Sequence, residues 1–184
     1  YRLPQRVAQI LLELYPDRKF NLLDLGCGTG LVGAKLGRIE GHIVGADLSD
    51  ETMHQTFKQE IYSKFYKTNV LDAVQETPSA HCTAITCMDT LPHVGDLTSV
   101  IPNALRILKP GGHFIFSCEA ADDKNAAFVL DRNTNRYAHG VEAVKRLCHD
   151  AGFGSTVVES VEQLRQEAGT PIPGFLVTAQ RPLA

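Results

Sequence analysis

The sequence predicts an α/β fold, built on a doubly wound sheet of about seven strands that is mostly parallel and ends in an antiparallel C-terminal hairpin. Three observations predict it. Short apolar runs of strand character alternate with segments of helical periodicity along most of the chain. A glycine-rich turn joins the first of these runs to a helix, as in Rossmann-like sheets. The last two runs have no long helix between them, which indicates an antiparallel pair at the sheet edge.

The first predicted strand and the turn after it carry the main signal for a ligand. A helical stripe over residues 4–15 comes first, and the apolar run from Phe20 to Leu25 then enters the glycine turn at residues 26–30. Glycine permits positive φ and a close approach of the backbone to a ligand, just before the helix expected over residues 31–36. Residues 28–33 also satisfy the dinucleotide pattern G-x-G-x-x-G, so the turn alone leaves two ligand classes open.

Asp24, inside the first strand, discriminates between those ligand classes. A carboxylate at this point would repel the pyrophosphate of a dinucleotide. S-adenosylmethionine has no phosphate and carries an ammonium and a sulfonium, so the same carboxylate would attract it. The alternative, a solvated Asp in an ordinary turn, is disfavoured because the apolar run places Asp24 inside the sheet. We therefore favour a methyl-donor site.

The second predicted strand also ends on an acid. It runs from His42 to Asp47, and an acid at this point of the second strand can accept hydrogen bonds from both ribose hydroxyls of a nucleoside. Ser49 is a good N-cap for the helix that follows, so a capping or solvated role for Asp47 is the alternative.

The rest of the chain continues the alternation. Strands are expected at residues 65–68, 84–88, 113–117, 157–158 and 175–179, and helices at about residues 97–108 and 141–148. Residues 119–136 are polar and aperiodic, which in an α/β protein marks a long loop at the carboxyl ends of the strands. We interpret residues 119–139 as a lid and acceptor-site insertion within a single domain that spans residues 1–184.

Composition excludes several classes of protein. With 184 residues and 43% hydrophobic content, the chain suits one globular domain, and its net charge of −3 argues against a general affinity for nucleic acid. The apolar runs are too short for a membrane span. The five cysteines include no C-x-x-C pair, which fits a reducing cytoplasm, and the seven histidines lack ligand spacing, so no metal site is predicted.

Several motifs together point to a known family. They are Asp24-Leu25-Gly26-Cys27-Gly28-Thr29-Gly30, the strand-end acid Asp47, Asp89 with Leu91 and His93, and Leu108-Lys109-Pro110-Gly111-Gly112. Through them nearly the whole chain resembles the class I S-adenosylmethionine-dependent methyltransferases. A narrower similarity, through residues 136–139, 164–167 and 173–176, is to predicted methyltransferases associated with tetratricopeptide repeats. That similarity implies a repeat array upstream of residue 1 in the native protein.

The resemblance implies S-adenosyl-L-methionine as cofactor, S-adenosyl-L-homocysteine as product, and a set of cofactor-binding residues. The set is Asp24, Gly26, Cys27, Gly28, Gly30, Asp47, Leu48, Asn69, Val70 and Asp89. Asp24 and the glycine turn would hold the methionine end and Asp47 the ribose. Asn69 stands where the family often has an acid for the adenine amino group, and its amide oxygen can accept the same hydrogen bond. The Val70 N–H would serve the adenine ring, and Asp89 would lie beside the methionine moiety or the acceptor.

Methyl transfer from a sulfonium is an in-line displacement with a neutral leaving group, so placing the acceptor behind the methyl is the main task. A general base is needed only if the acceptor must lose a proton. His93 and His139 are the candidates, because imidazole exchanges protons near neutral pH, and a capping or packing role is the alternative for each. Tyr137 and Arg136 are expected to shape the acceptor pocket. The acceptor, a small molecule or a protein, is not identified by these residues.

Two other functions compete with methyl transfer. A nicotinamide-dependent oxidoreductase would use residues 28–33, but Asp24 and the terminal hairpin count against it. A catalytically inactive module that binds the donor or a partner on the same fold would keep the glycine turn and lose the acceptor chemistry.

Overall fold

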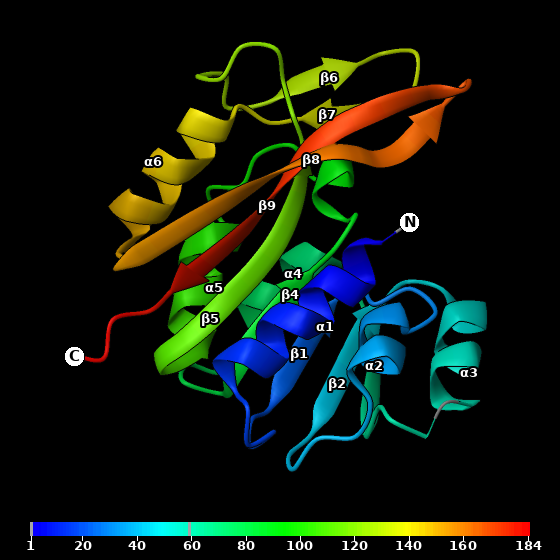
Figure 1. Cartoon of the computed structure of the whole chain (residues 1–184), viewed down its shortest axis with the longest axis vertical. Helices are drawn as coiled ribbons and strands as arrows, with labels where there is room; N and C mark the ends of the chain where they lie inside the picture. Colours follow the sequence, from blue (N-terminus) through cyan, green and yellow to red (C-terminus); the bar gives the residue numbers. More distant parts are fainter. Residues whose placement is uncertain (1, 59) are drawn as a thin grey trace.

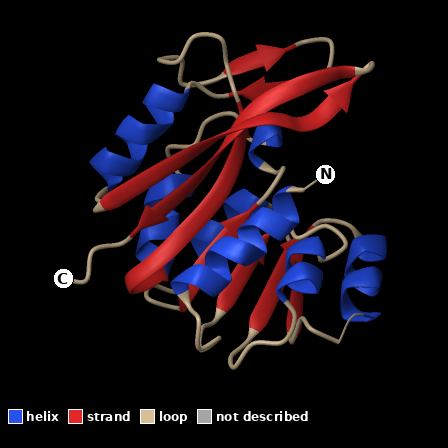
Figure 2. Cartoon of the chain, viewed as in Figure 1, coloured by secondary structure: helices blue, strands red, loops and turns tan. Residues whose placement is uncertain are grey.

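The structure is a computed structural model that describes residues 2–58 and 60–184. Its centre is a seven-stranded sheet with helices on both faces (Figure 1 and Figure 2). In spatial order the strands are β3 (Lys64–Lys67), β2 (Ile43–Asp47), β1 (Leu22–Leu25), β4 (Cys82–Cys87), β5 (Leu108–Glu119), β9 (Thr170–Gln180) and β8 (Ser155–Glu167). Neighbours from β3 to β5 run parallel, and β9 is antiparallel to both β5 and β8. The predicted fold class is confirmed.

Strand β1 lies at the centre of the parallel part of the sheet. All four of its residues are buried, and Leu25 stands opposite Ala46 of β2 on one side and Cys87 of β4 on the other. The chain therefore leaves β1 for β2 in one direction and returns to β4 on the opposite side. In doubly wound sheets such a switch point opens a crevice at the carboxyl ends of the strands.

The helices form a layer on each face of the sheet. They are α1 (Leu3–Leu14), α2 (Leu31–Leu36), α3 (Asp50–Lys58), α4 (Val70–Glu76), α5 (Val100–Ile107) and α6 (Val141–Ala151). The apolar stripe of α1 packs with α2 against Leu22 and Ile43, whereas α4, α5 and α6 share the opposite core with Leu23 and Phe114. Among the described residues, no helix is both long and apolar enough to cross a membrane.

The segment expected as a long loop contains a second, two-stranded sheet. Strand β6 (Val129–Asp131) pairs with β7 (Arg136–Ala138) to form a small hairpin above the main sheet (Figure 1). The turn is built from polar residues: Asp131 accepts hydrogen bonds from the backbone N–H groups of Asn133 and Asn135. Polar turn residues give no strand periodicity, which explains why the sequence indicated a loop.

The terminal hairpin is longer than the sequence predicted. Strands β8 and β9 extend past the main sheet and are joined by the tight turn at Ala168 and Gly169, both with positive φ. The predicted strand bounds of 157–158 and 175–179 are therefore too short, since residues 159–167 belong to β8 and residues 170–174 belong to β9. The extension pairs Arg165 with Ile172 and Glu167 with Thr170, and a register shift between Val161 and Arg165 separates it from the part of the hairpin inside the main sheet.

Candidate active site

A cavity of about 700 Å³ lies at the carboxyl ends of β1, β2 and β4. It is lined by the turn after β1, by the end of β2, by residues 68–72 and by residues from 88 to 94. This volume is in the range of sites for small molecules and cofactors. A second cavity, of about 1070 Å³, lies over β2 and β3 beside α4, but its wall has neither the glycine turn nor any predicted site residue.

The glycine turn needs its glycines for two different reasons. Gly26, Gly28 and Gly30 all have positive φ. A Cβ on Gly26 would lie 2.0 Å from the hydroxyl oxygen of Thr90, so the turn packs tightly against the segment after β4. A Cβ on Gly28 would meet no protein atom within 4 Å and would project into open space. Gly28 therefore leaves room for a ligand at the floor of the cavity.

Asp24 lies in the cavity wall and is 1% exposed. Its carboxylate accepts hydrogen bonds from the Tyr62 hydroxyl at 2.6 Å and the Thr86 hydroxyl at 2.9 Å. Burial raises the pKa of Asp24 to about 6, although the two hydroxyls act in the opposite direction. The Tyr62 oxygen also accepts from the Gly33 N–H at 3.1 Å, so the acid is linked to α2.

Asp47 faces the same cavity from the end of β2. Its two carboxylate oxygens accept from the backbone N–H of Gly28 at 3.0 Å and of Ser49 at 3.2 Å. These bonds fix the orientation of the carboxylate and leave lone pairs for further donors such as hydroxyl groups. Leu48, next to it, is 61% exposed at the rim of the cavity, where it offers an apolar surface to a flat ring.

Asn69 caps helix α4 in addition to lining the cavity. Its amide oxygen accepts from the Asp72 N–H at 2.8 Å, and its amide nitrogen donates to the Asp72 carboxylate at 2.9 Å. One lone pair of that amide oxygen is therefore already in use, and the second is available to an adenine amino group. Val70 and Asp72 also line the cavity here.

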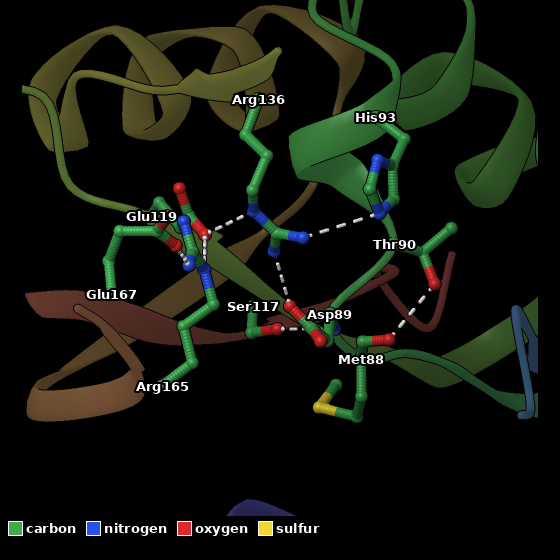
Figure 3. Close-up of polar contacts among 9 residues, drawn as sticks. All are labelled: Met88, Asp89, Thr90, His93, Ser117, Glu119, Arg136, Arg165 and Glu167. Carbon is green, nitrogen blue, oxygen red and sulfur yellow. Dashed lines mark hydrogen bonds and ion pairs between the residues drawn. The ribbon is translucent and has the colours of Figure 1, made fainter. Parts of the chain in front are cut away.

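The other end of the cavity carries a group of charged side chains, shown in Figure 3. Asp89 and His93 lie in the cavity wall. They face Arg136, which comes from strand β7. The Arg136 guanidinium donates to the Asp89 carboxylate at 2.8 Å and approaches Nε2 of His93 at 3.4 Å. The Asp89 backbone N–H donates to the Ser117 hydroxyl at 2.9 Å, and its φ of +49° is unusual for a residue other than glycine.

A protein-family model with the description "Methyltransferase domain" matches residues 1–159. The chain belongs to this methyltransferase domain family. Among curated relatives, the ubiquinone biosynthesis O-methyltransferase of Proteus mirabilis is 30% identical over 113 residues, which are 59% of this chain and 45% of that protein. The protein of the same name from Yersinia pestis is 30% identical over 148 residues, 78% of this chain and 56% of its own. The methyltransferase domain thus spans about half the length of the curated relatives it matches.

Solved structures confirm the fold of the methyltransferase domain at low identity. A Burkholderia thailandensis 1,6-didemethyltoxoflavin-N1-methyltransferase, solved with bound 1,6-didemethyltoxoflavin and S-adenosylhomocysteine, has a TM-score of 0.72 at 17% identity, with 98% of this chain and 79% of that chain covered. The [4+2]-cyclase SpnF has a TM-score of 0.76 at 18% identity, with 98% and 82% covered. Because a cyclase shares the fold, the fold by itself does not determine the reaction.

The structure brings most of the predicted cofactor residues of the methyltransferase domain into one cavity. Nine of the ten line it: Asp24, Gly26, Cys27, Gly28, Asp47, Leu48, Asn69, Val70 and Asp89. Gly30 instead forms the N-cap of α2 with a φ of +82°. Burial raises the pKa of the Cys27 thiol, so this cysteine contributes to the wall as a neutral group.

The three acceptor-site predictions differ in where their side chains lie. His93 lines the cavity, but His139 and Tyr137 are not among its lining residues. His139 is fully buried, with Nε2 at 2.6 Å from the Gly95 carbonyl oxygen, and burial lowers its pKa. The Tyr137 ring packs against Gly95 and edge-to-face against Phe128. In this structure both side chains hold the hairpin onto the segment after β4.

Sequence reasoning missed several residues that support the site. Tyr62 and Thr86 lie 38 and 62 residues from Asp24, and Glu119 lies 17 residues from Arg136. A polar residue on a neighbouring strand, as Thr86 is, could have been anticipated from the expected strand order. Tyr62 follows α3 in a segment without periodicity, so no local signal marks it.

Proposed function

We propose that this chain is an S-adenosylmethionine-dependent methyltransferase that binds its donor in the cavity at the β1, β2 and β4 ends and methylates a hydroxyl oxygen of a small molecule. One observation carries the proposal: a single cavity is lined by the glycine turn and Asp47 on one side and by Asp89 and His93 on another. This arrangement supports a donor site that lies next to a proton-accepting group.

The residues present fit this donor. The open space over Gly28, the paired oxygens of Asp47 and the exposed side chain of Leu48 suit the backbone approach, the ribose and the adenine of a nucleoside. When bound, S-adenosylmethionine supplies an electrophilic methyl group on a positively charged sulfur. Asp24 and Asp89 place carboxylates in the wall of the same cavity, which favours a cationic ligand over a pyrophosphate.

An oxygen acceptor is supported by the relatives, which are named O-methyltransferases at about 30% identity. A hydroxyl must lose its proton as it becomes the nucleophile. His93 lies in the cavity wall, and we assign it as the group that takes this proton. The alternative is a catalytically inactive module that binds donor or partner and methylates nothing.

The test incubates the purified chain with S-adenosylmethionine labelled with ¹³C at the methyl group and a small-molecule extract of bacterial cells. Carbon NMR then identifies the atom that received the methyl, because O-, N- and S-methyl groups differ in chemical shift. We expect new O-methyl signals in the wild type, and their intensity should fall at least tenfold in His93→Gln. The control His149→Gln should keep them, because His149 is exposed on α6. Only N- or S-methyl signals would contradict the oxygen acceptor, and donor binding without any methyl product would favour the inactive module.

A further inference from the structure

Arg136, in strand β7, makes three side-chain contacts, two of them with Asp89 and His93 at the proposed acceptor end of the cavity (Figure 3). Its Nε donates to Glu119 at 2.8 Å, one terminal nitrogen donates to Asp89 at 2.8 Å, and the other lies 3.4 Å from Nε2 of His93. The side chain is 15% exposed. A guanidinium is a rigid planar fork, so fixing Nε also fixes where its two terminal nitrogens point.

Glu119 provides that fixed point. It ends strand β5, its side chain is 8% exposed, and one of its oxygens accepts from both Arg136 at 2.8 Å and Arg165 at 2.7 Å. Arg165 comes from β8 and also pairs with Glu167. Two arginines therefore share one carboxylate, but only Arg136 reaches residues of the cavity wall. Charge-assisted bonds of this kind are stronger than bonds between neutral groups.

The contact between Arg136 and His93 has a consequence for the imidazole. A guanidinium nitrogen can only donate, so Nε2 of His93 must be the acceptor. In a neutral imidazole the proton then sits on Nδ1. Because Nε2 has a single lone pair, it can take a proton from an acceptor molecule only after that molecule displaces the Arg136 N–H from it.

We propose that Arg136, held by Glu119, is a positioning residue that keeps His93 in the tautomer with Nε2 unprotonated and holds the Asp89 carboxylate at the acceptor end of the cavity. Its catalytic consequence rests on the proposed function, whereas the tautomer itself does not. The competing explanation is that Arg136 only fastens the hairpin to the body of the domain.

The first test measures the ring tautomer of His93 by long-range ¹H–¹⁵N NMR, with the His93→Gln spectrum used to assign its signals. We expect the Nδ1-protonated tautomer in the wild type and a shift toward the Nε2-protonated tautomer in Arg136→Met, which has similar length and no donor. Arg165→Met is the matched control, because Arg165 shares Glu119 without contacting the cavity, and it should match the wild type. Glu119→Gln should also retain the wild-type tautomer, since its amide oxygen still accepts from Arg136.

The second test separates this inference from the proposed function. S-adenosylhomocysteine affinity, measured by calorimetry, should change less than twofold in Arg136→Met and Arg165→Met, whereas the O-methyl signal from labelled donor should fall at least tenfold in Arg136→Met alone. If the wild-type chain transfers no methyl group, the proposed function is contradicted, but the tautomer result still tests the positioning role of Arg136. The positioning role is overturned if His93 carries its proton on Nε2 in the wild type, or if the two methionine variants give the same spectra.

Discussion

Asp24 is held inside the protein at a cost in stability. Its carboxylate is buried, and the hydroxyls of Tyr62 and Thr86 compensate only part of the lost hydration, so its pKa rises from 3.8 to about 6. The folded chain therefore binds a proton at Asp24 more tightly than the unfolded chain does. The resulting stabilisation is fully present below pH 3.8, which is the ordinary pKa of an aspartate. It is lost as the pH rises through about 6, the pKa of Asp24 in the folded chain.

This linkage predicts the pH dependence of Asp24→Asn. Asparagine does not titrate, so the free energy of unfolding of the variant minus that of the wild type should increase between pH 4 and pH 8. The difference between a pKa of 3.8 and one of about 6 for Asp24 corresponds to roughly 3 kcal/mol. Urea unfolding at several pH values measures the difference. A difference in the free energy of unfolding that stays constant over this range would show that folding does not raise the pKa of Asp24.

At the residue scale, the acids of the site could be predicted from the sequence and their partners could not. Asp24 and Asp47 stand in or at the end of apolar runs, and parallel strands bring their ends to one edge. Tyr62, whose hydroxyl donates a hydrogen bond to Asp24, is not distinguished by any local sequence pattern. His139 was predicted as a candidate general base because imidazole exchanges protons near neutral pH, but its backbone pairs with Glu119 and its ring turns to Gly95.

At the element scale, the β6–β7 hairpin and its flanks join the acceptor end of the cavity to the rest of the sheet. Their base is fixed, since the His139 N–H donates to the Glu119 carbonyl at 2.8 Å and the Ala121 N–H donates to the His139 carbonyl at 2.9 Å. Farther out, Phe128 and Val129 are 44% and 49% exposed. Few buried side chains hold the outer part, which is typical of segments that order on ligand binding.

We therefore predict that residues 119–139 act as a lid. Amide hydrogen exchange in this segment should slow when S-adenosylhomocysteine binds, with the largest change at residues 122–135, beyond the fixed base. The turn at residues 166–171 between β8 and β9 is the internal control, because it is an exposed hairpin away from the cavity. If protection rises only at the glycine turn and Asp47, the segment is a passive surface hairpin.

Helices and strands that carry local sequence signals were predicted well, whereas elements that depend on contacts between distant residues were not. The helix α2 at Leu31–Leu36 has the predicted bounds, because a positive-φ glycine precedes it and another ends it. The parallel strands β1, β2 and β4 were found because most of their residues are buried and apolar. The β6–β7 hairpin was missed because Arg136 and Tyr137 fasten it through contacts with residues more than forty positions away, His93 and Gly95 among them.

At the scale of the whole molecule, the strand order decides where the site lies. The order β3-β2-β1-β4-β5 places the chain reversal between β1 and β4, and the ends of β1, β2 and β4 supply Asp24, Asp47 and Asp89. The larger cavity beside α4 has no comparable set of strand ends. Topology, rather than cavity size, therefore favours this cavity as the proposed donor site.

Gly28 and Gly169 offer a matched pair for testing that assignment. Both have positive φ, and a Cβ on either would meet no protein atom within 4 Å. Alanine at each position carries a similar backbone strain of about 1 kcal/mol. Only the methyl group at position 28 would enter the cavity, because Gly169 lies in the remote turn between β8 and β9.

Calorimetric titration of S-adenosylhomocysteine into the wild type, Gly28→Ala and Gly169→Ala tests the donor site most directly. We expect one site per chain in the wild type, the same affinity in Gly169→Ala, and at least tenfold weaker binding in Gly28→Ala. Unchanged affinity in Gly28→Ala, or no binding to the wild type, would contradict it.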